Sequence, residues 1–175
     1  MEPKSNPIYQ SAMTSGLILG IAQVTLILIV HLMGFDIIRP PFLATLLNYI
    51  IIIGVIIYST IKFRDESLDG EISYSKALGF GLLVSVFAGL VYGIYMIIHM
   101  RFIDTNYLTN FISAAEEVYY MSGFSEKQIE DALRLLEMIQ KPIVMVIYAV
   151  FGSTFLGLIF SLVTSIFLKK KKSIL

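Results

Sequence analysis

The sequence predicts an all-α integral membrane protein, a single membrane domain over residues 1–175 with four transmembrane helices and a helical hairpin between the third and the fourth. Composition is the first reason. The chain is 57% hydrophobic and only 15% charged, whereas a soluble domain is about half apolar and a quarter charged. The second reason is that four segments reach the roughly 20 apolar residues that a membrane-spanning helix needs. The third is a charged stretch, residues 120–142, that stands between the last two segments.

The four predicted spans differ at their edges. The first is too long for a signal-peptide core, so we expect it to be retained. Prolines precede the second and the fourth, and proline suits the first turn of a helix because its missing N–H would be unpaired there. The third is long enough to tilt in the bilayer or to protrude from it. The spans cover residues 12–34, 42–61, 77–103 and 143–168.

Basic residues beside the spans predict the orientation. Four spans place both termini on one side, and compact basic clusters mark the cytoplasmic side. We therefore expect cytoplasmic N and C termini in a bacterial inner membrane, with residues 104–141 outside the cytoplasm. The side of the termini carries Lys4, Lys62, Arg64, Lys76 and Lys169 to Lys172, and the other side carries Arg39, Arg101, Lys127, Arg134 and Lys141. The final lysines predict a stop-transfer anchor, and four lysines also suffice for a small anionic-lipid patch.

The outer insertion, residues 104–141, is predicted to form two amphipathic helices with more acidic than basic residues. Gly123 offers a stop for the first helix, and Ser125 with Gln128 forms a capping box for the second. Glu130 with Arg134, and Glu137 with Lys141, have the favourable i,i+4 order on a wet face. The predicted apolar faces are Leu108, Phe111, Ile112, Ala115, Val118 and Tyr119 in the first helix, and Ile129, Ala132, Leu133, Leu136 and Ile139 in the second.

Small residues recur at every fourth position in three spans. Such stripes let helices approach closely in lipid, where van der Waals contact replaces the hydrophobic effect. We expect them to pack the chain's own bundle, with a homo-oligomer as the alternative. The second span is bulky and β-branched, so it faces lipid or a partner's helix. The stripes are Ala12, Gly16 and Gly20; Ala77, Gly81, Ser85, Gly89 and Gly93; and Ala149, Ser153, Gly157, Ser161 and Ser165.

Polar residues inside the spans are few, and none is acidic, which disfavours a proton relay. Gln23 and Asn48 are the most deeply placed amides. We expect these amides to form hydrogen bonds between helices, with contact to a substrate as the alternative. Tyrosines near the outer boundary are typical of an aromatic belt at the headgroups. They are Tyr92, Tyr95, Tyr107, Tyr119 and Tyr120.

A histidine stands five residues before an aspartate twice, as His31 with Asp36 and His99 with Asp104. The repeat suggests either two related span hairpins, as in small transporters, or a coincidence. If the first and third spans touch, the two imidazoles and two carboxylates could bind a divalent metal such as zinc. Because neither pair has a dense cluster of ligands around it, we predict no metal, cofactor or catalytic residue.

Several function classes find no support. The formal net charge is zero, so no global field attracts nucleic acid. The chain has no cysteine, which excludes disulfides, thiolate metal sites and a cysteine nucleophile. No hydrolase, zinc-protease, Walker or dinucleotide motif is present. We therefore expect no enzyme.

Three segments resemble a family of uncharacterised bacterial membrane proteins, typical of the Bacteroidetes, known as domain of unknown function 4199. They are "KFRDESLDGEISYSKALGFG" (residues 62–81), "RFIDTNYL" and "SGFSEKQIEDAL". Thr105 stands where relatives often have proline, which affects how the outer helix begins. The resemblance covers nearly the whole chain and implies four inner-membrane spans with an extracytoplasmic helical insertion. It implies no activity.

We expect a non-enzymatic membrane accessory or interaction module, whose partners are the lipid bilayer and a membrane or extracytoplasmic protein. The charged helix in the insertion is too short to span, so its apolar face must cover something. The main alternative is a small solute transporter or channel, and the weaker one is an intramembrane enzyme. Residues that would line a path are Gln23, Asn48, Tyr58 and Tyr92.

Overall fold

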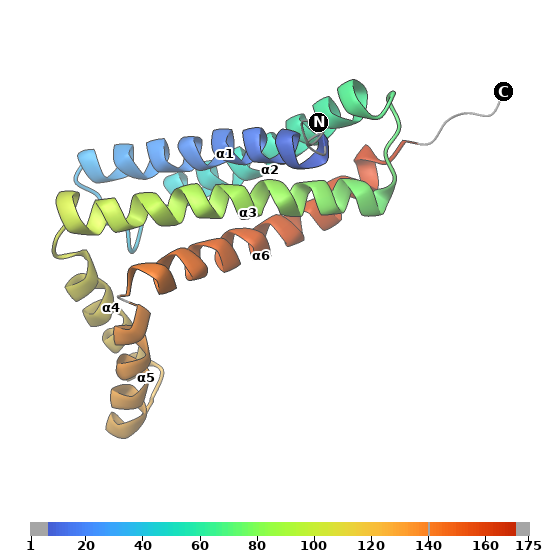
Figure 1. The fold of residues 1–175 in the computed structure, drawn as a ribbon. Helices are drawn as coiled ribbons and strands as arrows, with labels where there is room; N and C mark the ends of the chain where they lie inside the picture. Colours follow the sequence, from blue (N-terminus) through green and yellow to red (C-terminus); the bar gives the residue numbers. More distant parts are fainter. Residues whose placement is uncertain (1–6, 140, 171–175) are drawn as a thin grey trace, which may run out of the picture.

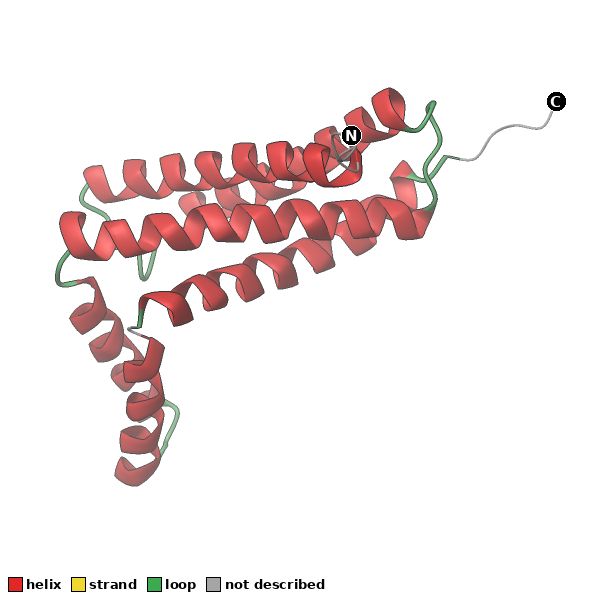
Figure 2. Cartoon of the chain, viewed as in Figure 1, coloured by secondary structure: helices red, strands yellow, loops and turns green. Residues whose placement is uncertain are grey.

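The computed structural model describes residues 7–139 and 141–170, apart from the side chains of residues 137 and 139. This part of the chain is helical and contains six α-helices and one π-helical turn (Figure 2). Four helices are long and apolar enough to cross a membrane: α1, α2, α3 extended by η1, and α6. The elements are α1 (Pro7–Leu32), α2 (Phe42–Ser67), α3 (Tyr74–Ile98), η1 (His99–Ile103), α4 (Tyr107–Met121), α5 (Glu126–Ile139) and α6 (Pro142–Leu168).

The four long helices lie side by side, whereas α4 and α5 turn away from them at one end (Figure 1). The helix α3 packs against both α6 and α1, and α2 packs mainly against α1. The start of α1 and the end of α6 both lie at the end of the bundle that is opposite α4 and α5. We call α4 and α5 the helix pair, and refer to the helix-pair end and the opposite end of the bundle.

The helix boundaries follow the predicted spans with two extensions. The helix α1 starts at Pro7, ahead of the predicted start, and α2 continues to Ser67, beyond the predicted end at residue 61. The predicted edges marked where apolar residues stop, but helical hydrogen bonding tolerates the polar residues that follow. Ser73 caps α3 by accepting a hydrogen bond from the Lys76 N–H at 3.3 Å, as predicted. Asp69 and Gly70 both have positive φ in the predicted turn before it.

The small-residue stripes pack the chain's own bundle, as predicted. The whole stripe of α3 is buried, from Ala77 to Gly93, and it faces the stripe of α6. A methyl group on Gly89 would lie 2.7 Å from the Cα atom of Val150, so only glycine fits there. The Ser153 hydroxyl donates to the Ser85 carbonyl oxygen at 2.8 Å across the same contact.

Close packing also joins α1 to α3. Gly16 lies against Phe87 and the backbone of α3, and Gly20 lies against Val91. In the second span, by contrast, Gly54 has open space around its Cα. The helix α2 buries side chains only in its second half, from Ile52 to Phe63. Its first half therefore carries the bulky exposed surface that its composition predicts.

Backbone hydrogen bonds close the opposite end of the bundle. Ile72 and Lys170 exchange hydrogen bonds of 3.0 and 2.9 Å, which tie the α2–α3 connection to the end of α6. Arg64 pairs with Asp65 at 2.7 Å and also donates to the Leu168 carbonyl oxygen at 3.5 Å. The predicted lysine-rich end continues past this point, and Lys171 and Lys172, like Lys4, lie outside the described residues.

Local signals set the limits of the helix pair. Gly123 has φ +79° after the end of α4, and Ser125 with Gln128 forms the predicted capping box through hydrogen bonds of 2.9 and 3.4 Å. Arg134 bonds Glu130 at 2.7 Å, whereas the predicted Glu137–Lys141 pair lies outside the described side chains.

Neighbouring helices cover the described part of the predicted apolar face of α5, whereas the side chain of Ile139 lies outside the described residues. Ile129 is buried, and Ala132, Leu133 and Leu136 are half-buried, where α5 contacts α4 and α6. The predicted face of α4 is half-buried except at Val118, which is exposed. Val118 lies at the edge of that stripe at 100° per residue, so including it in the covered face was wrong.

Candidate functional site

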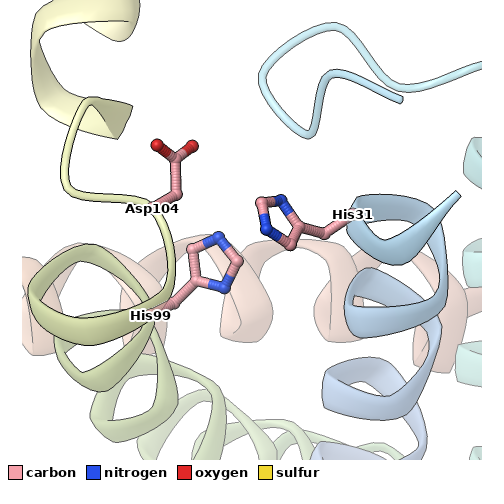
Figure 3. A group of neighbouring side chains, drawn as sticks. All are labelled: His31, His99 and Asp104. Atoms are coloured by element: carbon pink, nitrogen blue, oxygen red, sulfur yellow. The ribbon is translucent and has the colours of Figure 1, made fainter. Parts of the chain in front are cut away.

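The repeated histidine–aspartate pattern converges at the helix-pair end of the bundle. His31 comes from the last turn of α1, His99 from the start of η1, and Asp104 from the residue after η1. One possible ligand atom from each of the three side chains lies within 4.8 Å of the other two. Figure 3 shows the imidazole rings of His31 and His99 next to each other, with the Asp104 carboxylate to one side of them. We call these three residues the histidine cluster.

A π-helical turn places Asp104 over His99. The Asp104 N–H donates to the His99 carbonyl oxygen at 2.8 Å, which is the five-residue hydrogen bond that closes the turn. In an uninterrupted α-helix, side chains five residues apart point to different sides, because each residue adds 100°. Such π-turns are rare and occur often at functional sites.

His99 is fully buried, and its two ring nitrogens differ. The Nδ1 atom is 2.8 Å from the Tyr95 hydroxyl, one helical turn earlier on α3. The Nε2 atom is buried and has no hydrogen-bond partner among the described residues. The His31 ring meets the His99 ring edge-on, with 5.0 Å between centroids.

Asp36, the fourth residue of the predicted set, does not join the cluster. Its carboxylate instead accepts a hydrogen bond from the Ile38 N–H at 2.8 Å within the α1–α2 connection. The charge of Asp36 still acts on Tyr107 of α4. Burial raises the pKa of the Tyr107 hydroxyl, and the carboxylates of Asp36 and Asp104 raise it further. Tyr107 therefore stays protonated at neutral pH and remains a hydrogen-bond donor.

Beside the histidine cluster lies a cleft of about 510 Å³. All four long helices contribute to its walls, and α4 covers it through Tyr107, Leu108 and Phe111. Its volume falls in the range of small-molecule sites, and its lining is mostly apolar with a few polar groups, as in such sites. The polar lining residues are Gln23, Thr45, Asn48, Tyr49, Tyr92, Tyr107, Tyr148 and Ser153.

The two amides predicted to meet between helices do so in this cleft. Gln23 donates to the Asn48 side-chain oxygen at 3.2 Å, which joins α1 to α2. The Gln23 side-chain oxygen is buried without a partner among the described residues. Tyr92 lines the same cleft, so three of the four residues predicted for a path come together.

Tyr58, the fourth of these residues, lies elsewhere. It lines a groove of about 620 Å³ near the opposite end, to which only α1 and α2 contribute. Between the groove and the cleft, Leu19, Ile52 and Ala88 form a buried layer. The prediction that Tyr58 shares a path with the other three is therefore not met by this conformation.

Two contacts at this end were missed in the sequence. Tyr95 precedes His99 by four residues, and this helical spacing could have identified it as the partner of the ring. Arg39 pairs with Glu117 at 2.7 Å and donates to the Ala114 carbonyl oxygen at 3.3 Å, so it fastens α4 to the α1–α2 connection. No local pattern relates Arg39 to α4, because the two are far apart in the chain.

Of the predicted tyrosine belt, Tyr92, Tyr95 and Tyr107 surround the histidine cluster and the cleft. Tyr119 packs against Phe124 within the helix pair, with ring centroids 5.5 Å apart, and Tyr120 is exposed. The five tyrosines therefore lie in two different places: three lie at the histidine cluster and the cleft, and two lie in the helix pair.

Comparison with known proteins agrees with the family resemblance. No curated protein and no solved structure matches the chain significantly. A family model described as protein of unknown function (DUF4199) matches residues 14–170, and the chain therefore belongs to this family.

Proposed function

We propose that the chain is a non-enzymatic interaction module of a bacterial inner membrane, which presents the helix pair as an acidic hairpin outside the cytoplasm. One observation carries the proposal. The 510 Å³ cleft at the helix-pair end is walled by all four long helices and covered by α4. A buried layer separates it from the opposite end. We therefore expect a ligand or a partner to bind at the helix-pair end of the bundle.

The outer surface of the bundle supports a membrane location. Large apolar side chains are exposed along α1, α2 and α6, including Leu17, Phe42, Phe151 and Phe167. A helix that is hydrophobic around its whole circumference belongs in lipid or in a large core. Because this bundle has only four long helices, lipid is the better solvent for these faces.

Charge distribution supports the proposed orientation. Lys62, Arg64, Lys76, Lys169 and Lys170 belong to the helix ends and connections of the opposite end. Short basic flanks of this kind mark the cytoplasmic side. The helix pair then lies outside the cytoplasm, with both chain termini inside.

The helix pair has an apolar surface that the chain leaves bare. Leu135 and Met138 are 63% and 58% exposed one helical turn apart on α5. The segment that carries this surface, residues 104–141, contains seven acidic and three basic residues. Anionic headgroups repel such a surface, so we expect a protein partner with basic groups around an apolar patch.

Single cysteines test the orientation, because the chain has none of its own. We expect a membrane-impermeant maleimide to label Ser125→Cys in intact cells and to label Glu71→Cys only after the membrane is broken. The opposite pattern would overturn the proposed topology.

Capture of neighbours from native membranes tests the interaction. We expect Leu135→Glu combined with Met138→Glu to reduce recovery of a cross-linked partner at least about tenfold, because two apolar contacts become charged. Lys127→Glu changes the net charge by the same amount on an exposed position of the same helix and should have a smaller effect. Equal losses from both variants, or recovery of the chain alone, would count against the module.

A second candidate function, passage of a small solute, is favoured by the polar groups in the cleft. Gln23, Asn48 and Tyr92 gather there in the predicted manner. Passage would require the layer of Leu19, Ile52 and Ala88 to open. Solute flux into liposomes that contain the purified chain, abolished by Asn48→Leu, would favour this candidate over the module.

A further inference from the structure

We propose that His31, His99 and Asp104 bind a divalent transition-metal ion, which we assign as zinc. The site lies at the helix-pair end, next to the cleft that Val30, Met100 and Tyr107 help to line. It does not depend on the proposed function, because it uses different side chains from those that face a partner.

The first argument is convergence of donors from separate parts of the chain. His31 lies in the last turn of α1, and His99 and Asp104 lie after the end of α3. Their ligand atoms nevertheless lie within 4.8 Å of one another. In a tetrahedral zinc site with bonds of about 2.1 Å, ligand atoms are about 3.4 Å apart. Side-chain rotations that move each ligand atom by about 1 Å close the difference.

The second argument is the unpaired nitrogen of His99. A buried polar atom without a partner is destabilising, so an imidazole whose only role was packing would destabilise the protein at this fully buried position. The other ring nitrogen is held by the Tyr95 hydroxyl at 2.8 Å. Donation from Nδ1 to Tyr95 leaves the Nε2 lone pair free for a metal, which is the usual arrangement around metal-binding histidines.

The third argument is the backbone that holds the ligands. The π-turn from His99 to Ile103 brings Asp104 back over His99. An α-helix would have carried this carboxylate to a different side. The Asp104 carboxylate also accepts a hydrogen bond from the Asn106 N–H at 3.1 Å. A serine or asparagine side chain could accept that bond as well, so it does not by itself account for a carboxylate beside two imidazoles.

The donor set selects the class of ion. Calcium and magnesium prefer oxygen ligands throughout, whereas two imidazoles and one carboxylate suit zinc and its first-row neighbours. Zinc accepts a tetrahedral site with three protein ligands and an open fourth position. A water molecule or another ligand would take the fourth position.

Calorimetry on the purified full chain in detergent, stripped with a chelator and titrated with zinc chloride, tests the site. We expect one zinc per chain. His31→Ala and Asp104→Asn should weaken zinc binding more than about 100-fold, and Tyr95→Phe about 10- to 100-fold as the loss of an orienting partner. Asp36→Asn is the matched control, because Asp36 lies outside the cluster, and it should bind zinc like the unaltered chain.

His31 and Asp104 are only half-buried, so the metal-free melting temperature of their variants should stay close to that of the unaltered chain. Cobalt substitution gives an independent reading, through visible absorption bands that His31→Ala removes. Zinc binding that survives both His31→Ala and Asp104→Asn would overturn the site. An equal loss in Asp36→Asn, or no binding by the unaltered chain, would overturn it as well.

Discussion

The two halves of α2 show how differently the two ends of the bundle are built. From Ile52 to Phe63 this helix buries side chains, and Phe63 stacks on Phe80 of α3 with ring centroids 4.5 Å apart. From Ala44 to Tyr49 it lines the cleft instead. The contact between α3 and α6, by contrast, is close at both ends, through Gly81 and Gly93. One pair of helices therefore forms a continuous spine, whereas α2 contributes to the core with one part of its length and lines the cleft with another.

This difference indicates that one end of the bundle is built mainly for close packing and the other end for binding. Close packing at the opposite end holds the helices in a single arrangement, because interdigitated backbones have few alternatives. At the helix-pair end, amides and tyrosines line the cleft, and α4 covers it. The two helices of the spine therefore hold the bundle together and also contribute side chains to the cleft, such as Tyr92 of α3 and Ser153 of α6.

The largest effect should come from breaking the spine. Gly89→Leu places a side chain where a single methyl group would already lie 2.7 Å from the Val150 Cα atom. Since backbone rather than a flexible side chain obstructs it, we expect a loss of more than about 3 kcal/mol and failure to recover folded protein. Thermal unfolding in detergent, followed by circular dichroism, measures the change.

Gly79→Leu is the matched control for that variant. Gly79 lies on the same helix with no atom within 4 Å of its would-be Cβ. We expect its replacement to change stability by less than about 1 kcal/mol, because the added side chain meets open space. If the two leucine variants melt alike, α3 and α6 are not in the described contact.

An intermediate effect should come from the cleft. Asn48→Leu removes the hydrogen bond of 3.2 Å from Gln23 and leaves two polar atoms of Gln23 unpaired. We expect a loss of about 1 kcal/mol, the usual size for a hydrogen bond between membrane helices. A double-mutant cycle with Gln23→Leu, read from thermal unfolding, should return a coupling energy of similar size. Additive losses would separate the two amides.

The smallest effect should come from the fastening of the helix pair. Arg39→Ala removes an ion pair with Glu117 whose side chains are both more than half exposed, so we expect a global loss below about 0.5 kcal/mol. Hydrogen exchange in α4 should nevertheless become faster, because α4 loses its link to the α1–α2 connection. Arg134→Ala removes an exposed pair within α5 and should leave exchange in α4 unchanged. Unaltered exchange after Arg39→Ala would show that α4 is held by other contacts.

The local parts of the fold were predictable because they depend on neighbours in the chain. Ser73, Gly123 and the pair Ser125–Gln128 mark helix ends through hydrogen bonds and φ values that these residue types favour in any context. The small-residue stripes also predicted which helix faces pack together, because faces made of glycine, alanine and serine let two helix backbones approach closely.

The candidate sites were predictable only in part. Two histidine–aspartate pairs were visible, and they pointed to the correct end of the bundle. The sequence could not exclude Asp36, because its place depends on the path of the α1–α2 connection. The four-residue spacing between Tyr95 and His99, by contrast, could have identified Tyr95. Tyr58 was wrongly grouped with Gln23, Asn48 and Tyr92. It lies ten residues beyond Asn48, about 15 Å along the same helix, and lines the groove near the opposite end instead.

By itself, the sequence determined the four apolar helices, their caps and the residues along which they approach one another, since each follows from composition and spacing within one segment. Only the tertiary structure decided that a cleft opens between the four long helices beneath α4, and that His31 meets His99 and Asp104. These features depend on distances between segments far apart in the chain. Such distances are set by the packing of whole helices, which no single segment records.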